Sequence, residues 1–312
     1  MPKHHICVAC LIGLLMACSN SQDNTPIKIG INPWPGYEFL YLAQEKGFYD
    51  EVGVDVKIIE YRSLSDVRRG YERGNLDAMA STLIEVLQVK NNSTRDPNVF
   101  LIADYSDGGD VILARNFNSV QELKGKRIAA STTSLPIFML ARALNLAGLS
   151  LTDVEVVPME QSDIALAYAE NRIDAAVTYP PLSIELSKQQ DTHTIFSSAD
   201  IPGEVVDVVS AEFSVLKQRK SDFEKILLAW DKALEFAKKH PDEAYEIMGN
   251  RESITAKEFK QAIDDMKILS VNEQQKYFPT LPATLKRVRN VLVASGVLSE
   301  SVSADCCIHQ IN

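Results

Sequence analysis

The sequence predicts an α/β protein made of two similar lobes. Short apolar, β-branched segments alternate with helical segments at a spacing that favours mostly parallel sheets covered on both faces. About 285 residues follow the N-terminal segment, which is at or above the size at which one hydrophobic core stops growing. A stretch of sequence also recurs at a constant offset of 97 residues, in which Ser65, Asp66, Val67, Tyr71, Leu76, Asp77 and Ala78 correspond to Ser162, Asp163, Ile164, Tyr168, Ile173, Asp174 and Ala175. Two facing lobes leave a cleft, and clefts bind ligands.

The N-terminal segment is typical of a secretory signal. Lys3 precedes an apolar run from Ile6 to Ala17 that is too short to span a bilayer. The run ends in Leu15-Met16-Ala17-Cys18, which resembles the lipobox of bacterial lipoproteins. We therefore expect residues 1–17 to be removed, Cys18 to carry a lipid and residues 18–26 to form a tether. This places the protein on the periplasmic or cell-surface side of a membrane, anchored through Cys18.

Charge and cysteine content exclude several classes of function. The formal net charge of −10 becomes −11 when the signal, which holds Lys3 and no acidic residue, is removed. An acidic surface argues against a nucleic-acid partner. Outside the signal and Cys18, the chain has only the adjacent pair Cys306 and Cys307, and neighbouring cysteines rarely form an ordinary disulfide. We expect a frayed C-terminal tail there, with no metal site and no cofactor.

The elements of the two lobes follow the same order. Residues 27–31 predict a strand, followed by a loop over 32–37, a helix that ends at Gly47 and a strand over 54–59. The second set is a strand over 127–130, a loop over 131–135, a helix that ends at Gly148 and a strand over 154–157. Further strands are expected at 99–103 and 111–114, and capping boxes at Thr82, Ser119, Ser221 and Thr255.

The chain is expected to pass between the lobes twice. The second copy of the repeat begins near Gly125 and ends near Tyr179, so the crossings should lie at residues 107–114 and 205–210. From Ser221 onward the pattern predicts helices only, which should return to the first lobe. We therefore assign residues 27–107 and 208–312 to the first lobe and residues 108–207 to the second.

Candidate ligand-binding residues follow from the position of the loops. In an open α/β sheet the ligand lies beyond the carboxyl ends of the strands. The loops at those ends and the two crossings supply the candidates, which are Trp34, Tyr37, Ser81, Thr82, Asp107, Asp110, Ser131, Thr132, Thr133, Ser134, Tyr179 and Asp207. None of these loops contains Lys, Arg or His.

Several of these residues have a structural role as an alternative. Ser131 to Ser134 offer hydroxyls and free N–H groups to an anionic group at a helix N-terminus, or one of them simply caps the helix. Thr82 is also explained as a helix N-cap, because Glu85 follows it at the spacing of a capping box. The loop aromatics either stack on a ligand or pack under neighbouring loops. Asp107 and Asp110 pair with an amine or form a turn. Asp207 lies inside an apolar strand, so its carboxylate should have a partner.

These residues belong to motifs that resemble those of a known family. The motifs are GINPWPGY (30–37), LAQEKGFY (42–49), GNLDA (74–78), LKGK (123–126) and RIDAAV (172–177) with Tyr179-Pro180. The likeness, over residues 27–298, is to the substrate-binding proteins of nitrate/sulfonate/taurine-type ABC importers, which include relatives that bind thiamine pyrimidine precursors. The loops that hold the candidate residues line the pocket in that family.

The resemblance implies a fold and a function. The fold is the two-lobed periplasmic-binding-protein fold (type II), with two crossover strands between the lobes. The function is capture of a small sulfonate, a zwitterion such as taurine, or another amine-containing solute by hinge closure, as a monomer that delivers it to an ABC permease with its ATPase. The absence of basic residues from the loops argues against nitrate.

Two other functions are compatible with the sequence. The closed form could be presented to a membrane sensor protein instead of a permease, and nothing in the chain separates these. A thiamine pyrimidine synthase-like enzyme is disfavoured, because those enzymes use a lysine-bound pyridoxal phosphate, a histidine and a cysteine cluster. Here the cysteines are terminal and the candidate loops lack His and Lys.

Overall fold

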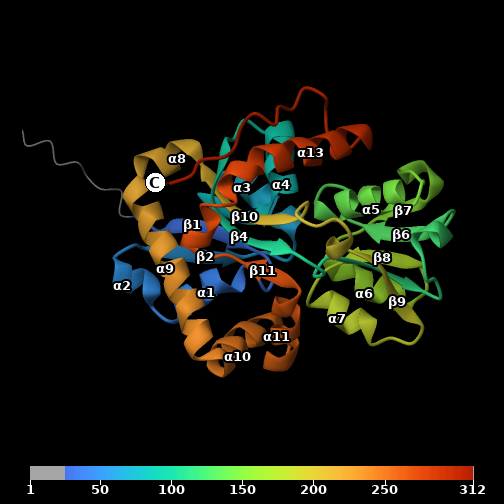
Figure 1. Ribbon diagram of the computed structural model, residues 1–312, viewed down its shortest axis with the longest axis horizontal. Helices are drawn as coiled ribbons and strands as arrows, with labels where there is room; N and C mark the ends of the chain where they lie inside the picture. The colour runs from blue at the N-terminus through green and yellow to red at the C-terminus, as the bar shows by residue number, and fades with distance from the viewer. Residues whose placement is uncertain (1–24, 312) are drawn as a thin grey trace, which may run out of the picture.

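The computed structural model describes residues 25–311 and contains two sheets, each with its own helices, as two lobes side by side (Figure 1). The expected signal at residues 1–17, the lipidation site Cys18 and most of the expected tether lie outside the described residues. None of the described helices is both long and apolar enough to cross a bilayer.

The first lobe is built on a sheet of six strands in the order β11-β4-β10-β3-β1-β2. Its strands are β1 (Ile27–Ile31), β2 (Val56–Glu60), β3 (Ala78–Thr82), β4 (Pro97–Ser106), β10 (Val206–Glu212) and β11 (Met266–Ile268). β1 is parallel to β2 and β3, whereas β10 is antiparallel to β3 and β4. Strand β3 is buried along its whole length, as expected of a central strand covered on both faces.

The helices of the first lobe come from both ends of the chain. They are α1 (Glu38–Glu45), α2 (Phe48–Val52), α3 (Leu64–Glu72), α4 (Leu83–Asn92), α8 (Phe213–Gln218), α9 (Lys220–Lys239), α10 (Pro241–Glu252), α11 (Ala256–Asp264), α12 (Val271–Gln274) and α13 (Leu281–Ala294), with a 3-10 turn at Phe278–Thr280. Helix α9 packs on α1 and α2 through edge-on contacts of Phe39 with Trp230 and of Phe48 with Phe236. Helix α13 contacts α4 and reaches α5 of the second lobe.

The second lobe has a sheet of five strands in the order β7-β6-β8-β5-β9. Its strands are β5 (Val111–Arg115), β6 (Arg127–Ala130), β7 (Glu155–Pro158), β8 (Ala175–Thr178) and β9 (Thr192–Ser197). Its helices are α5 (Leu135–Leu146), α6 (Gln161–Ala169) and α7 (Leu182–Ser187), with 3-10 turns at Val120–Leu123, Leu151–Asp153 and Ser198–Asp200.

The two sheets repeat one topology, which supports the internal repeat seen in the sequence. β6 is parallel to β7 and β8, and β5 is antiparallel to β8 and β9, so the directions match those in the first sheet strand by strand. The repeated aspartates also make the same bonds. The carboxylate of Asp77 accepts the N–H of Lys28 at 2.9 Å, and that of Asp174 accepts the N–H of Arg127 at 2.9 Å. In each lobe this bond ties the start of the first strand to the third.

Two connections join the sheets. The chain leaves β4 at Ser106 and enters β5 at Val111, and it returns from β9 to β10 through residues 198–205. Residues 206–210, which the sequence suggested as a crossing, are part of β10 in the first sheet. The side chain of Ser198 binds the outgoing connection, with its Oγ 2.8 Å from Ser106 Oγ and 2.7 Å from the N–H of Gly108. The two connections therefore lie against each other.

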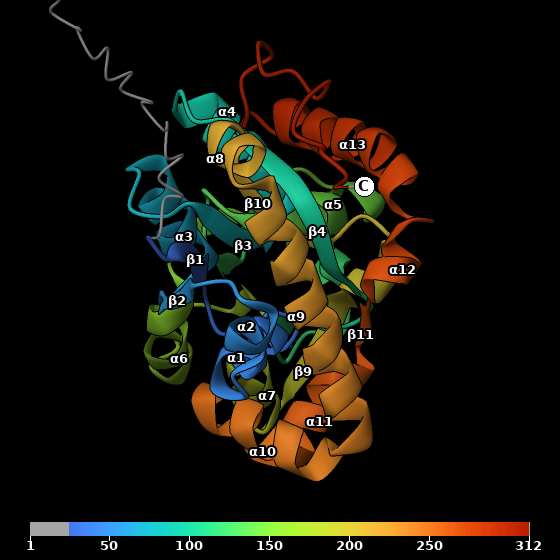
Figure 2. The same ribbon diagram turned by 90° about the vertical axis from the view of Figure 1, so that its left-hand side faces the viewer.

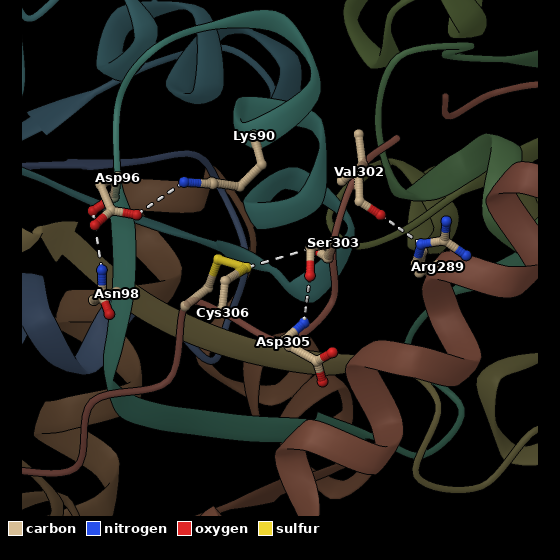
Figure 3. Close-up of a disulfide and its surroundings, with 9 residues drawn as sticks. Lys90, Asp96, Asn98, Arg289, Val302, Ser303, Asp305 and Cys306 are labelled. Carbon is tan, nitrogen blue, oxygen red and sulfur yellow. Dashed lines mark hydrogen bonds and ion pairs between the residues drawn. A yellow bond between two sulfur atoms is a disulfide. The ribbon is translucent and has the colours of Figure 1, made fainter. Parts of the chain in front are cut away.

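The C-terminal tail is not frayed. Cys306 and Cys307 form a disulfide, and the Cys307 side chain is 4% exposed (Figure 3). The carbonyl of Cys307 accepts the N–H of Val99 at 2.8 Å, and the N–H of His309 donates to the carbonyl of Val99 at 2.9 Å. The expectation was wrong because these backbone bonds join β4 to residues about 200 positions later, a pairing that local sequence does not encode. Figure 2 shows the end of the chain returning to the first lobe.

Candidate functional site

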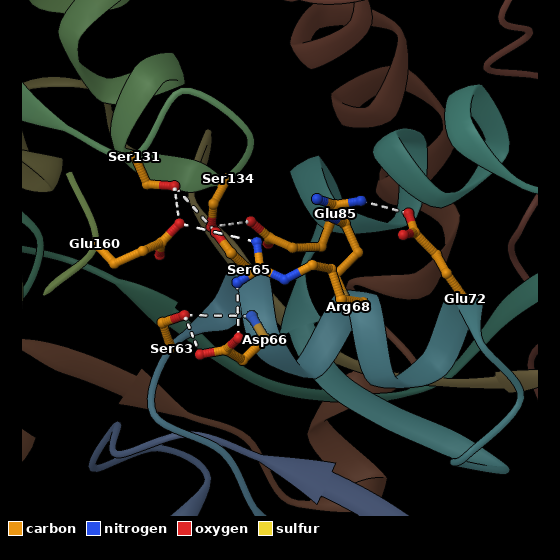
Figure 4. Close-up of polar contacts among 10 residues, drawn as sticks. Ser63, Ser65, Asp66, Arg68, Glu72, Glu85, Ser131, Ser134 and Glu160 are labelled. Carbon is orange, nitrogen blue, oxygen red and sulfur yellow. Dashed lines mark hydrogen bonds and ion pairs between the residues drawn. The ribbon is translucent and has the colours of Figure 1, made fainter. Parts of the chain in front are cut away.

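The candidate site lies where the loops of the two lobes meet. The Trp34 ring, after β1, contacts the Tyr179 ring, after β8, with centroids 6.0 Å apart and planes at 79°. Ser65 Oγ at the start of α3 lies 3.0 Å from Ser131 Oγ after β6 (Figure 4). These contacts join the carboxyl ends of strands from both sheets, which is where ligands bind in open α/β sheets.

Three buried carboxylates converge beside Trp34 and Tyr37. They are Asp104 on β4, Asp110 on the outgoing connection and Asp207 on β10, and they are 0%, 2% and 2% exposed; we call them the carboxylate cluster. The indole N–H of Trp34 donates to Asp104 Oδ2 at 3.2 Å, and the Tyr37 hydroxyl donates to Asp207 Oδ1. Among the described residues, nothing donates to Asp104 Oδ1, Asp110 Oδ2 or Asp207 Oδ2.

Burial dominates the electrostatics of the carboxylate cluster. Loss of hydration raises the pKa of Asp104 to about 8 and that of Asp110 to about 7, and it raises the pKa of Asp207 well above the ordinary value. The negative charges of Asp104 and Asp110 raise the pKa of Asp207 further. Within the part of the chain that the structure describes, no Lys, Arg or His forms an ion pair with the cluster. A bound cation would reverse these shifts by pairing with the charged form.

Two glycines allow this close packing. A Cβ atom at Gly36 would lie 1.9 Å from Asp104 Oδ2, and one at Gly109 would lie 2.8 Å from the Trp34 ring. Both distances are below any van der Waals contact. These glycines are thus required for the indole and the carboxylates to reach their positions.

Glu85 adds a fourth carboxylate, which bridges the lobes. It lies in the first turn of α4 and is fully buried. Its Oε2 accepts the N–H and the hydroxyl of Thr82 at 2.9 and 2.6 Å, forming the capping box that the sequence predicts. Its Oε1 accepts the Ser134 hydroxyl at 2.7 Å and the N–H of Leu135 at 2.8 Å. The N-terminus of α5, where we expected an anionic ligand group, is therefore occupied by Glu85.

The structure brings most of the candidate residues together. Those buried where the lobes meet are Trp34, Tyr37, Ser81, Thr82, Asp110, Ser131, Ser134, Tyr179 and Asp207. Thr132 and the exposed Thr133 line a cavity of about 670 Å³ at the mouth of the cleft, which Arg69 and Arg172 also line. Asp107 is exposed and lies apart from the cluster, with its N–H donating to the Asp265 carbonyl at 2.9 Å.

Sequence reasoning missed Asp104 and the cross-lobe role of Glu85. Asp104 follows the apolar run 99–103 directly, which is the same signal that identified Asp207, a carboxylate inside an apolar strand. Glu85 was explained by its local cap, and its second partner is about 50 residues away in sequence.

A second cavity of about 500 Å³, lined by Tyr179, Arg62 and Lys188 among others, opens on the side of α7 and α10.

Curated proteins that are similar to this chain carry names of two kinds, putative binding proteins and a putative thiamine biosynthesis protein. A putative binding protein of Brucella abortus is 24% identical over 236 residues, which cover 72% of this chain and 71% of that protein. A putative thiamine biosynthesis protein of Haemophilus influenzae is 24% identical over 243 residues, covering 76% of each chain.

Solved structures share the fold. The alkanesulfonate-binding protein SsuA of Xanthomonas axonopodis pv. citri, bound to MOPS, superposes with a TM-score of 0.75 at 14% identity, covering 91% of this chain and 99% of that one. The desulfurization enzyme DszB superposes with a TM-score of 0.64 at 16% identity, covering 90% and 95%. The expected two-lobed periplasmic-binding-protein fold is thus confirmed, and the fold is shared by a binding protein and an enzyme.

Residues 34–244 match the sequence model of a protein family that is described as NMT1/THI5 like. This range covers the repeat in both lobes, the two connections and every buried candidate residue of the cleft. The chain therefore belongs to the NMT1/THI5-like family.

Proposed function

We propose that this protein is the extracytoplasmic solute-binding subunit of an ABC importer and that its solute carries a positively charged amine. The carboxylate cluster is the observation that carries the proposal. Three buried carboxyl groups, on β4, on β10 and on the connection from β4 to β5, each have an oxygen that has no donor among the described residues. An ammonium or amidinium group supplies the missing donors and the opposite charge.

The aromatic side chains support an amine-bearing solute in a second way. Trp34, Tyr37 and Tyr179 lie on both sides of the cleft beside the cluster, and aromatic faces attract cations. Their rings also offer apolar surface to the rest of the solute. A flat or aliphatic amine fits this combination of acidic and aromatic groups.

A sulfonate or another oxyanion fits the inner cleft poorly. It would face the carboxylate cluster and Glu85, and no described basic side chain pairs with the cluster. Among the described residues, the basic side chains that line the two cavities are Arg69 and Arg172 in one and Arg62 and Lys188 in the other. The buried Arg68 on α3 is already paired with Glu72. A zwitterion such as taurine would therefore have to place its amine inward and its sulfonate outward.

The two-lobed fold supports delivery to a permease. A solute that contacts both lobes gains contacts only when they close, so its differential affinity for the closed form sets the population of that form. A permease with its ATPase would recognise the closed lobes of a monomer tethered through Cys18. A membrane sensor would recognise the same form, and copurification of the solute-loaded protein with a permease or a sensor distinguishes these.

An enzymatic role has less support. The buried residues of the cleft include carboxylates, hydroxyls and aromatics, but no described Lys or His lies among them. The family does contain proteins with enzymatic names. Incubation of the protein with any amine that it binds, followed by mass spectrometry of the amine, should show the compound unchanged.

Isothermal titration calorimetry tests the proposal. A thermal-shift screen first compares primary amines, aminopyrimidines, taurine and alkanesulfonates, because a solute at 100 times its Kd stabilises the fold by about 2.7 kcal/mol. Asp207→Asn should then weaken the selected amine by roughly 10- to 100-fold, since a charged partner is lost from a buried ion pair. The matched control is Asp107→Asn, which alters an exposed aspartate. Equal affinities for both variants, or selection of alkanesulfonates over amines, would reject the proposal.

A further inference from the structure

We propose that Glu85 is a built-in anion that fastens the two lobes together and keeps oxyanion solutes out of the cleft. The inference deepens the proposed solute-binding function, because it names a class of solute that the cleft refuses. It depends on the second pair of hydrogen bonds that Glu85 makes, which its local role in α4 does not require.

The local role of Glu85 uses one of its two oxygens. Oε2 accepts both bonds from Thr82 and completes the capping box of α4. Such a box is a common way to satisfy the free N–H groups of a helix N-terminus. Oε1 takes no part in the bonds to Thr82.

Helix α5 in the other lobe lacks what Glu85 offers. It spans 12 residues, has no acidic residue in its first turn and receives no hydrogen bond from the side chain of its own N-cap, Ser134. The free N–H groups and the positive end of the helix dipole therefore need an acceptor. Glu85 Oε1 provides it from across the cleft, accepting the N–H of Leu135 and the Ser134 hydroxyl (Figure 4). In effect, α5 is capped by the opposite lobe.

Capping from the opposite lobe makes the cap dependent on closure. When the lobes separate, α4 keeps its capping box but α5 loses its acceptor. The bond between Ser65 and Ser131 beside it is lost at the same time. Hydrogen bonds to a charged acceptor are stronger than those between neutral groups, so the two bonds bias the protein towards the closed form.

The same arrangement decides which solutes can enter. A helix N-terminus preceded by hydroxyl groups, as Ser131 to Ser134 precede α5, is a site that phosphate, sulfate and sulfonate groups favour. Here a fully buried carboxylate already holds the two donors, and its negative charge opposes a second anion. Glu85 thus converts a position that suits an oxyanion into part of the closure contact.

Two variants and one control test the inference. Glu85→Gln removes the charge, and Ser134→Ala removes one cross-lobe donor while leaving the capping box of α4 intact. The control, Glu273→Gln, alters the capping-box glutamate of α12, which binds Ser270 within the first lobe. Circular dichroism and urea unfolding of the purified full-length proteins establish that each variant is folded.

Small-angle X-ray scattering measures closure without any solute. Both Glu85→Gln and Ser134→Ala should have a larger radius of gyration than the native protein, whereas Glu273→Gln should not. Radii equal to that of the native protein in both variants would overturn the fastening role. This result is independent of which solute the protein carries, so it does not depend on the amine assignment.

Calorimetry with sodium ethanesulfonate and sodium sulfate measures exclusion. Saturable binding of either anion should appear in Glu85→Gln and be absent from the native protein and from Glu273→Gln. Failure of both anions to bind to folded Glu85→Gln would overturn the exclusion role. Strong binding of ethanesulfonate to the native protein would overturn it too, and would at the same time reject the amine proposal.

Discussion

Replacing Asp104 with Asn should change how the stability of the protein depends on pH. Burial raises the pKa of the Asp104 carboxyl to about 8, against about 3.9 for an aspartate in an unfolded chain. The folded state therefore keeps a proton on Asp104 between about pH 5 and pH 7 that the unfolded state has lost. Since the folded pKa is the higher one, the stabilisation is greatest at low pH and declines as the pH rises towards 8.

The magnitude follows from one proton. Each unit of pH increase lowers the free energy of unfolding by about 1.4 kcal/mol for each proton that the folded state retains and the unfolded state has lost. Between pH 5 and pH 7 the native protein should lose about 2.7 kcal/mol through Asp104 alone. The Asp104→Asn variant does not carry this proton. Its free energy of unfolding, minus that of the native protein, should therefore rise by about 2.7 kcal/mol over the same interval.

Urea unfolding at pH 5, 6 and 7 measures this difference. Taking the difference between two proteins cancels the contributions of carboxyl groups that do not interact with Asp104, such as Glu38, whose pKa is also raised. Asp107→Asn, which alters an exposed aspartate outside the carboxylate cluster, is the matched control. A difference for Asp104→Asn that is also constant from pH 5 to 7 would refute the conclusion that Asp104 is held protonated by burial.

Three further predictions concern other parts of the molecule. Gly36→Ala should abolish amine binding and destabilise the fold by about 1 to 3 kcal/mol in urea unfolding, because the new methyl group meets Asp104 Oδ2; unchanged binding would contradict the packing. Arg251→Met should cost about 3 to 5 kcal/mol, since it leaves the fully buried Glu38 without its ion-pair partner; a loss below 1 kcal/mol would show that Glu38 is already neutral. Cys18→Ser should release the exported protein from membranes in cell fractionation, and continued membrane association would reject the lipid anchor.

The fold could be predicted from the sequence because most of its helices and strands follow from local sequence patterns. Alternating apolar segments, glycine stops and the repeat predicted β1, β2, β4, β5, β6 and β7, and the capping boxes at Thr82 and Thr255 are present as expected. The expectation of helices only after Ser221 was wrong, because the edge strand β11 is three residues long and is defined by its pairing with β4. The box at Ser221 is absent, because α9 begins at Lys220, directly after α8, and Ser221 is already inside the helix. Local patterns cannot place a helix start that the preceding helix determines.

The candidate site was predicted in part, for a related reason. Loop position identified Trp34 and Tyr37, since strand ends converge in any sheet of this type, and Asp207 was identified as a carboxylate inside an apolar strand. Asp107 and Asp110 flank Gly108-Gly109, and only the fold decides that Asp110 is buried and Asp107 is exposed. The partnership of Glu85 with α5 depends on how the lobes approach each other, which no single segment encodes.

The contact between the two connections has a consequence for how this protein can be varied. Because Ser198 binds the segment that leaves Ser106, residues 111–197 form one continuous insertion whose ends emerge next to each other. Such a segment can be exchanged as a cassette with its counterpart from a relative without rerouting the host chain. A chimera of this kind would keep Asp104 and Asp207 and acquire foreign versions of Tyr179 and Ser134, so half of the recognition surface could be replaced in one step.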